Sequence, residues 1–400
     1  MTKYLSGQGF GLILSFISSL IIIRTFPIEE FAIYVLFAAL TTVQAVGSDL
    51  GLGTCALTLL AKSRHSPVKQ GQIIAAALKI ESKLVVLGLI LSLSLGSILI
   101  IGMEINISRI PLLAVAVIAF GHLQAILNIK KSRLNANQSQ REIFIVTLLE
   151  GLVKITAAST TYIWPEVEAV ALLSILGWLL IIKFADRTSP VKHSEVDAIR
   201  QRLLKGTVKI APTTLFFLIQ ANFAVFVLSY FNLKTSVAEL GALGRLGQIV
   251  GFISLAIPVY IQPVFANLDG HIYRKSLFRL CAVAIIIFLA LVISTKIGAE
   301  HWVMILGARY KYLEPLIGLA VLGPATYVLA LVLNAVVQAK HTSVWQNVTV
   351  GTALITQIIF CTAVGLNDTA DALIFNMIPS AAMLTTQIGL IAYMLKVGKY

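Results

Sequence analysis

Five ionisable side chains lie inside or at the ends of long apolar segments, where a charge is costly to bury. Glu150 and Lys154 stand four residues apart, in the favourable order for a pair on one helix. Arg245 is surrounded by glycines, Arg24 ends the first apolar segment, and Asp49 lies near the end of the second. Ionisable groups in such segments usually face a water-filled cavity and contact a substrate or an ion.

Each of these residues also has a plainer interpretation. Glu150 and Lys154 could neutralise one another and only lower the cost of insertion. Arg24 could anchor its helix at the membrane interface, and Arg245 could extend its guanidinium to the outer interface. Asp49 could cap the turn that follows it. The sequence leaves both interpretations open for each residue.

The apolar segments themselves predict an all-α integral membrane protein. The chain has 400 residues, of which 58% are hydrophobic and only 12% are charged. An ordinary soluble domain carries about 25% charged residues. About 20 apolar residues are needed to cross the hydrocarbon core. We expect twelve transmembrane helices at residues 7–24, 30–52, 78–101, 110–128, 142–163, 167–184, 207–231, 239–264, 278–298, 314–337, 345–365 and 371–395.

The basic residues alternate between the gaps that separate these segments. Of the 31 Lys and Arg residues, 23 fall in or beside every second gap, six fall in the other gaps, and Lys154 and Arg245 lie within segments. Because basic loops stay in the cytoplasm, both termini are predicted to be cytoplasmic, in a multi-pass protein of the bacterial inner membrane. Basic residues spread over short loops do not form a nucleic-acid-binding face, so no nucleic-acid partner is expected.

The longest polar stretch divides the chain into two halves. We expect an N-terminal six-helix bundle at 1–184, a basic cytoplasmic linker at 185–206 and a C-terminal six-helix bundle at 207–400. The two halves share a weak internal repeat, because Glu30-Phe31-Ala32 and Glu239-Leu240-Gly241 open their second spans 209 residues apart. Six spans plus six is a common transporter plan.

The motifs of membrane enzymes are missing from the sequence. There is no HExxH, no GxxxxGK[ST] and no DxD motif, and the six histidines have no metal-ligand spacing. No catalytic residues, metal site or cofactor are therefore expected. The chain is predicted to move a substrate rather than to transform one.

Three stretches resemble the Wzx-type polysaccharide flippases of the multidrug/oligosaccharidyl-lipid/polysaccharide exporter superfamily. Residues 24–34 and 49–52 resemble the first hairpin of that family, which reads Arg, apolar, Pro, Glu, Phe, Gly and Tyr, and then Asp-x-Gly-Leu. Ala32 replaces the usual glycine, whereas Gly241 holds the equivalent place in the second half. Residues 305–310 are similar to the Phe-Gly-x-x-Tyr segment of the family.

The resemblance implies two six-helix bundles arranged as a V around a central cationic cavity. It implies transport of an undecaprenyl-diphosphate-linked oligosaccharide, such as an O-antigen unit of lipopolysaccharide, from the cytoplasmic to the periplasmic leaflet. Arg24 and Arg245 match arginines of related flippases, and the resemblance implies that these two contact the diphosphate. Lys154 is a further candidate for substrate binding, because it is a cation near the middle of its predicted span. Glu150 and Asp49 are the candidate groups for coupling to an ion gradient or to the membrane potential. The partners would be the lipid-linked oligosaccharide, the bilayer and other polysaccharide-assembly proteins.

Two other functions compete with this one. A cation-coupled drug antiporter of the same superfamily would have an acidic cavity rather than a basic one. An O-antigen polymerase has a similar number of spans but needs a large arginine-rich outer loop, and the outer loops of this sequence are short.

Overall fold

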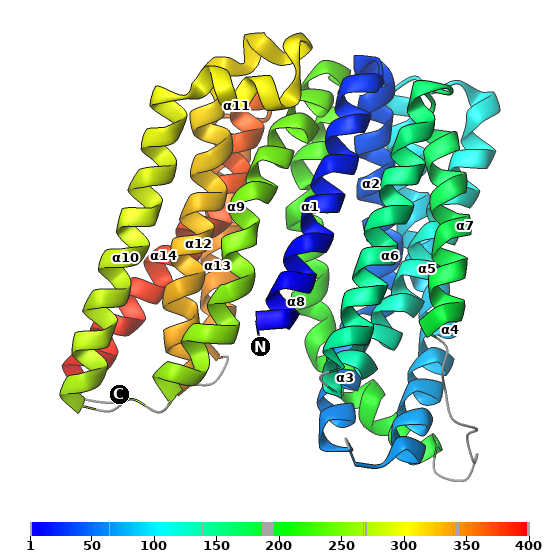
Figure 1. Cartoon of the computed structure of the whole chain (residues 1–400). Helices are drawn as coiled ribbons and strands as arrows, with labels where there is room; N and C mark the ends of the chain where they lie inside the picture. Colours follow the sequence, from blue (N-terminus) through cyan, green and yellow to red (C-terminus); the bar gives the residue numbers. More distant parts are fainter. Residues whose placement is uncertain are drawn as a thin grey trace. The chain divides into compact units, whose positions relative to one another are not determined.

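The computed structural model describes residues 2–63, 65–137, 139–185, 196–266, 268, 270–340 and 344–397. All regular structure in these residues is helical, with fourteen α-helices and a few short 3₁₀ turns (Figure 1). The helices divide into two compact units, Met1–Val237 and Ala238–Tyr400. The predicted all-α membrane class is therefore confirmed.

Unit 1 holds the first eight helices. They are α1 (Thr2–Thr25), α2 (Ile28–Asp49), α3 (Leu52–Lys62), α4 (Pro67–Gly102), α5 (Ile110–Ala136), α6 (Gln140–Ser159), α7 (Val167–Ala185) and α8 (Val196–Tyr230). Helix α1 packs along α6, α2 packs against α4 and α5, α5 packs against α7, and α8 packs against α4. Because α8 packs within this unit, the observed boundary lies after α8, and the predicted division into two six-span halves stays a prediction.

Unit 2 holds most of α9 (Lys234–Ala266), whose first turn belongs to unit 1, and all of five further helices. These are α10 (Gly270–Ile297), α11 (Ala299–Leu306), α12 (Ile317–Lys340), α13 (Val344–Ala363) and α14 (Thr369–Val397), with the 3₁₀ segment η4 (Ala308–Leu316) before α12. Helix α12 lies at the centre of this unit, because it packs against both α10 and α14.

The predicted spans each fall on a separate long helix. Nine helical segments among the described residues are long and apolar enough to cross a membrane. The sequence missed the short helices α3 and α11, and it placed the start of α4 at residue 78 rather than at Pro67. At 1.5 Å per residue, the 36 residues of α4 extend about 54 Å. Its first turns are polar, so a hydropathy criterion excludes them although they are helical. The cytoplasmic placement of the termini stays a prediction.

Local signals explain where the first helices begin and end. Two acidic residues in the first turn of α2 favour its N-terminus electrostatically. Leu50 and Gly51 then adopt left-handed backbone conformations, with φ of 46° and 83°, which stop α2 and turn the chain into α3. Ser66 accepts a hydrogen bond from the amide of Lys69 and caps α4.

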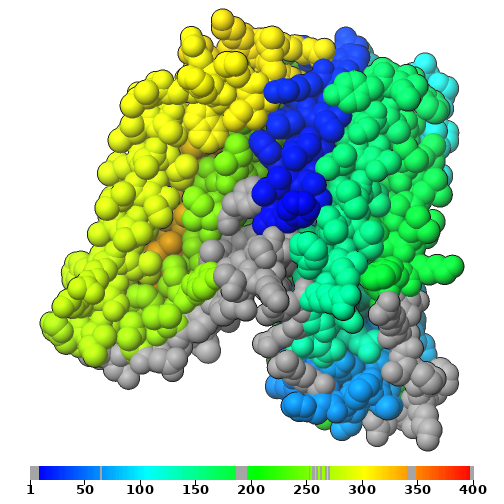
Figure 2. Space-filling view, in the orientation of Figure 1, coloured from blue at the N-terminus to red at the C-terminus, as the bar shows by residue number. Residues whose placement is uncertain are grey.

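The surface of α10 has the composition of a lipid-facing helix. Phe278, Ile286, Ile293 and Ile297 are exposed along it, and Figure 2 shows the surface of α10 in yellow-green to yellow. A soluble protein rarely leaves an apolar band of this extent exposed. The exposed band is consistent with a multi-pass membrane protein.

The internal repeat that the sequence suggested has a structural counterpart. Glu30 opens α2 and accepts a hydrogen bond of 2.8 Å from the amide of Val167, the first residue of α7. Glu239, in the first turns of α9, accepts a hydrogen bond from the hydroxyl of Thr369, the first residue of α14. In each half, a glutamate near the start of the second long helix (α2 or α9) thus accepts a hydrogen bond from the start of the sixth long helix (α7 or α14).

Candidate functional site

Two of the residues singled out in the sequence, Glu150 and Lys154, line one cavity within unit 1. This cavity has a volume of about 170 Å³ and lies between α1, α5 and α6. Its polar lining comes from Ser15 of α1, Lys131 and Asn135 of α5, and Thr147, Glu150 and Lys154 of α6. The charged side chains in this lining are two lysines and one glutamate, so the cavity carries net positive charge.

The charged groups of the cavity connect the three helices. The ammonium group of Lys131 lies 2.5 Å from Oε1 of Glu150, and that of Lys154 donates a 3.0 Å hydrogen bond to the hydroxyl of Ser15. The sequence paired Glu150 with Lys154 along one helix, but the ion pair found for Glu150 joins it to α5. Both carboxylate and ammonium groups are partly buried, and a charge in such a place interacts more strongly than it does in water.

Glycines allow α1 to approach α6 closely enough to close this cavity. A Cβ added at Gly11 would lie 2.1 Å from the Thr147 side chain, and one at Gly151 would lie 2.6 Å from Leu14. Small residues at such crossings let helix backbones approach in a membrane. The seam between α1 and α6 thereby fixes Ser15 opposite Lys154.

The other predicted site residues lie elsewhere. Arg24 is exposed in the last turn of α1, about 13 Å along the helix from Ser15. Asp49 accepts hydrogen bonds from the amides of Gly51 (3.2 Å) and Gly53 (2.9 Å), which is the capping role that the sequence left open. Arg245 lies half-buried on α9 of unit 2 and forms no ion pair with a side chain that the structure describes.

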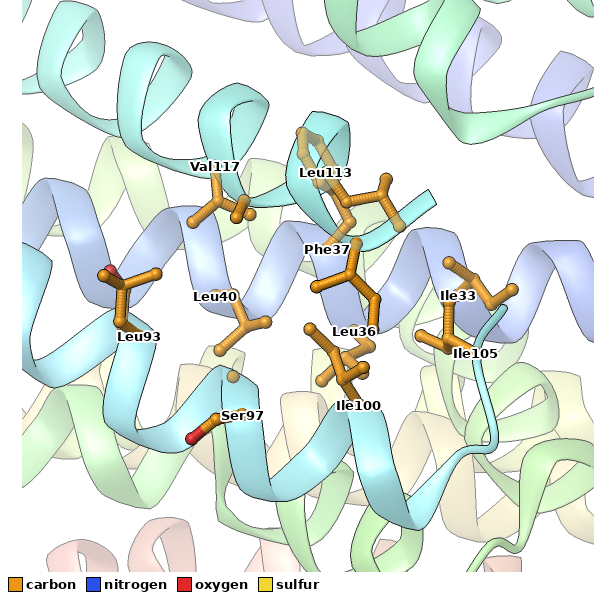
Figure 3. Close-up of a pocket in the computed structure, with 14 residues that line it drawn as sticks. Ile33, Leu36, Phe37, Leu40, Leu93, Ser97, Ile100, Ile105, Leu113 and Val117 are labelled. Carbon is orange, nitrogen blue, oxygen red and sulfur yellow. The ribbon is translucent and has the colours of Figure 1, made fainter. Parts of the chain in front are cut away.

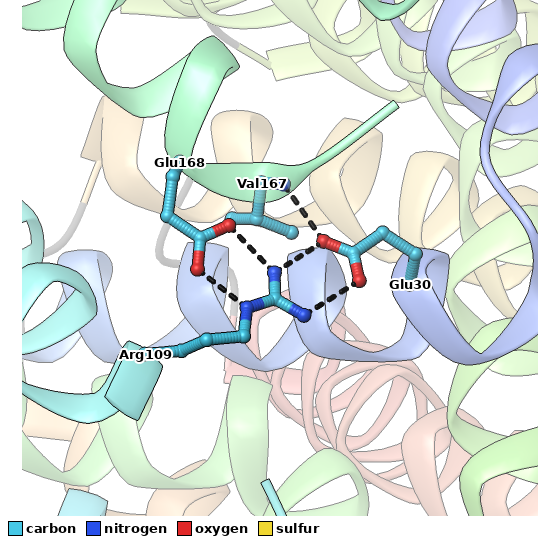
Figure 4. A network of polar contacts seen from close by, with 4 residues as sticks. All are labelled: Glu30, Arg109, Val167 and Glu168. Atoms are coloured by element: carbon cyan, nitrogen blue, oxygen red, sulfur yellow. Dashed lines mark hydrogen bonds and ion pairs between the residues drawn. The ribbon is translucent and has the colours of Figure 1, made fainter. Parts of the chain in front are cut away.

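A second charged cluster, which the sequence reasoning did not single out, joins α2, α5 and α7 (Figure 4). Arg109 precedes α5 and donates from Nε and Nη2 to Glu168, both at 2.6 Å. It also donates from Nη1 and Nη2 to Glu30, at 3.0 and 2.6 Å. Glu30 additionally accepts the amide hydrogen of Val167. One guanidinium therefore makes two bidentate contacts, a geometry that Arg supports and Lys does not.

This second cluster holds its three helices together rather than offering a binding site. Arg109, Glu30 and Glu168 satisfy one another, and the carboxylate of Glu168 is only 5% exposed. A signal was present in the sequence, since Arg109 is one of the few basic residues in the gaps predicted to face outward. Its two partners lie 79 and 59 residues away, however, and no spacing rule connects them.

An apolar pocket of about 200 Å³ lies between α2, α4 and α5 (Figure 3). Leu36, Leu40, Ile100 and Leu113 are among its lining residues, and Ser92 and Ser97 are its hydroxyl-bearing ones. Both hydroxyls donate hydrogen bonds within the protein, to Gln44 and to the carbonyl of Ser94. A pocket of this kind suits a hydrocarbon group and has no means of binding an ion.

No group of three or more His, Cys, Asp or Glu side chains in the described part of the chain could hold a metal ion. Unit 1 thus contains a cationic cavity, an apolar pocket and a satisfied ion cluster, among other features.

The chain shares its fold with known membrane transporters. It matches a lipid II flippase, MurJ, in an inward closed conformation, with a TM-score of 0.73 and 13% identity over 98% of this chain and 88% of that one. It also matches a MATE-family multidrug resistance transporter of the MOP superfamily in an inward-facing conformation, with a TM-score of 0.64 and 14% identity over 96% and 95% of the two chains. A further match is a MATE structure in a bent conformation, with a TM-score of 0.65 and 14% identity over 100% of this chain and 95% of that one.

No family model and no curated protein matches the sequence. At 13 to 14% identity, the structural matches establish the fold, an all-helical membrane fold like those of MurJ and the MATE proteins. These neighbours are transporters and not enzymes.

Proposed function

We propose that this chain is a flippase that moves an undecaprenyl-diphosphate-linked oligosaccharide from the cytoplasmic to the periplasmic leaflet of the bacterial inner membrane. The observation that carries the proposal is the cationic cavity of unit 1, with Lys131 and Lys154 around a single carboxylate. A polyprenyl diphosphate is anionic, and a partly buried pair of ammonium groups attracts phosphate oxygens strongly.

The fold supports the same proposal. The match to a lipid II flippase has a higher TM-score than the matches to MATE transporters, and lipid II is by name a lipid substrate. The apolar pocket between α2, α4 and α5 offers a surface suited to hydrocarbon in the same unit. A lipid-linked substrate needs both kinds of surface, because one end of it is charged and the other is apolar.

Individual residues have proposed roles. Lys154 and Lys131 contact the diphosphate in the cavity, and the diphosphate contacts that the resemblance implies for Arg24 and for Arg245 stay predictions. Glu150 and Asp49 are candidates for coupling to an ion gradient or to the membrane potential. Of these two, Glu150 is the more direct candidate, because its ion pair with Lys131 would be exchanged when a phosphate enters the cavity.

The competing function is export of a cationic drug by a MATE-type antiporter, to which the structural matches also extend. Glu150 is the feature that favours it, since a carboxylate in a cavity can bind a cation. The two lysines in the same lining oppose it, because like charges repel a cationic drug. An O-antigen polymerase has less support, because the structural neighbours are transporters.

Reconstituted vesicles test the proposal. A fluorescent undecaprenyl-diphosphate oligosaccharide would be flipped by the wild type, measured as the fraction that a membrane-impermeant reductant quenches over time. Loss of one charged contact of about 1.5–3 kcal/mol lowers affinity at least tenfold, so Lys131→Ala and Lys154→Ala should flip the lipid about tenfold more slowly at low substrate. Lys79→Ala is the matched control, because Lys79 is exposed on α4 and lies outside the cavity lining.

The same vesicles separate the two functions. Uptake or export of a cationic dye is measured in parallel with lipid flipping. Normal flipping by both cavity variants, or dye transport without any lipid flipping by the wild type, would contradict the proposal.

A further inference from the structure

Unit 1 contains a buried acid–base pair that none of the roles above uses. Nδ1 of His122 on α5 lies 2.8 Å from Oε1 of Glu81 on α4. The side chain of Glu81 is only 2% exposed, whereas that of His122 is 35% exposed. A carboxylate is costly to bury without a partner, so the imidazole is the group that allows Glu81 to be inside the bundle.

The pair lies deep within its two helices. His122 is about 18 Å along α5 from its first residue, and Glu81 is about 21 Å along α4 from its first residue. Neither position is at a helix end, where capping would explain a charged group. Glu81 lies just inside the third predicted span and His122 lies inside the fourth, and ionisable residues within such apolar segments are usually functional.

A buried polar layer adjoins the pair. Gln44 of α2 donates to the hydroxyl of Ser48 and to the carbonyl of Val85, one turn beyond Glu81, and accepts a hydrogen bond from Ser92. A Cβ at Gly121, next to His122, would lie 2.5 Å from the Gln44 side chain. The pair therefore opens on one side to the surface of unit 1, through the exposed part of the His122 ring, and on the other to a hydrogen-bonded interior.

The neighbouring charged groups determine how the pair can titrate. Asp49 of α2 is close enough to interact electrostatically with Glu81, and the Cys55 thiol of α3 interacts in turn with Asp49. Among the described residues, Glu81 is the charged group that acts on His122. On α4 and α5 the basic residues are Lys130, which is buried, Lys131 and Arg133, which are half-buried, and Lys69, Lys79 and Lys83, which are exposed. Among the helices packed on them, α3 adds Lys62 and α8 adds Arg200, Arg202, Lys205 and Lys209.

We infer that Glu81 and His122 form a proton-binding site, and that a proton gradient acts on the transport cycle at this site, which leaves Glu150 and Asp49 as candidates for coupling to other ions or to the membrane potential. One proton is held between Nδ1 of His122 and Oε1 of Glu81, which makes the pair neutral overall. When that proton leaves through the exposed ring, a neutral imidazole and a buried carboxylate remain, and the pair carries one negative charge beside Asp49.

The change of charge allows the site to affect how α2, α4 and α5 pack against one another. An uncompensated carboxylate next to a second carboxylate favours any arrangement of these helices that admits water or separates the two groups. The helices cross tightly here, since a Cβ at Gly88 would lie 2.7 Å from the Gln44 carbonyl oxygen. Protonation favours the closed packing of these helices, and loss of the proton favours its loosening. The coupling to transport rests on the proposed function, but the binding of a proton does not.

Protonation is measured directly on the purified protein in lipid nanodiscs, without any substrate. Infrared difference spectra between mildly acidic and mildly alkaline pH should contain the ring bands of a protonated His122, or the carbonyl band of a protonated Glu81 where the shared proton lies on the carboxyl, and Glu81→Gln should remove or displace the signal. Nuclear magnetic resonance of the histidine rings should show a titration that His122→Asn removes and Glu81→Gln displaces. Glu104→Gln and His271→Asn are the controls, because both side chains are exposed, and neither should remove these signals.

The transport arm uses the vesicles described above, with and without an imposed pH gradient. The ratio of the two flipping rates should exceed one for the wild type and for Glu104→Gln, and should fall to one for Glu81→Gln and His122→Asn. Size-exclusion profiles verify that each variant is folded. If Glu81→Gln or His122→Asn is not folded, Glu81→Asp and His122→Gln are measured in their place.

The results distinguish this inference from the proposed function. A carboxyl at Glu81 and a ring at His122 that keep one protonation state across the whole pH range would overturn the inference. So would variants that respond to the gradient as the wild type does. If both groups titrate as expected but no lipid is flipped at any gradient, the proposed function fails while the proton site stands.

Discussion

Replacement of Arg109 by alanine should destabilise unit 1 through the carboxylates that it leaves behind. The guanidinium makes four hydrogen bonds to Glu30 and Glu168. Removal of one partner of a buried ion pair costs about 3–5 kcal/mol. Arg109 is 25% exposed and Glu168 is 5% exposed, so solvent screens part of this cost and we expect about 3 kcal/mol.

The source of that cost can be tested with two further variants. In Arg109→Lys a single ammonium group cannot make two bidentate contacts, so only part of the stability should return. In the triple variant Glu30→Gln, Arg109→Met and Glu168→Gln no charge remains unpaired. The triple variant should therefore be more stable than Arg109→Ala, although it has lost more interactions.

The assay is equilibrium unfolding in mixed micelles of dodecylmaltoside and SDS, followed by far-ultraviolet circular dichroism. Hydrogen exchange adds a local measurement, because Glu30 also accepts the amide hydrogen of Val167. Exchange at the start of α7 should accelerate in Arg109→Ala, whereas exchange in unit 2 should not change. An Arg109→Ala protein as stable as the wild type, or a triple variant less stable than Arg109→Ala, would refute the reasoning.

Three further predictions concern positions outside the cavity. Gly88→Leu should prevent close packing of α4 on α2, because even a Cβ would lie 2.7 Å from the Gln44 carbonyl oxygen, and we expect a loss of at least about 2 kcal/mol in the same unfolding assay. Thr369→Val removes the hydrogen bond to Glu239 and should cost about 1 kcal/mol, with faster hydrogen exchange at the start of α14 and unchanged exchange at α7. Gly51→Ala places a side chain at φ of 83° and should cost about 1 kcal/mol of stability. Gly389→Ala is the control, because a Cβ there meets nothing within 4 Å, and it should have little effect. Equal stabilities of the two variants would contradict this explanation.

The sequence predicted some of the candidate site. The i, i+4 spacing of Glu150 and Lys154 placed both on one face of α6, and both do line one cavity. Lys131 was counted among the basic residues of a loop, although α5 extends to Ala136 and carries it into that cavity. The end of α5 is polar, so the hydropathy pattern predicted the end of the span but not the end of the helix.

The roles predicted for Arg24 and Arg245 have a different origin. Their roles came from a resemblance in short stretches, and the structure places Arg24 in the last turn of α1 and Arg245 on α9. Glu81 was not singled out at all, because it stands among basic residues near the predicted start of the third span. Its partner His122 lies on α5, and the sequence did not predict that these two helices bring the two side chains together.

The sequence by itself determined the helical membrane class, the approximate positions of the long helices and the equivalence of Glu30 with Glu239. These follow from local properties, since a helix in lipid satisfies its own backbone and needs only a long enough apolar run. Only the tertiary structure decided that Arg109 joins Glu30 to Glu168, that Lys131 pairs with Glu150, and that His122 holds Glu81. Helices that are apolar on nearly every side give little indication of which face meets which neighbour, so the pairing of their few charged groups depends on how the helices are ordered and rotated in the bundle.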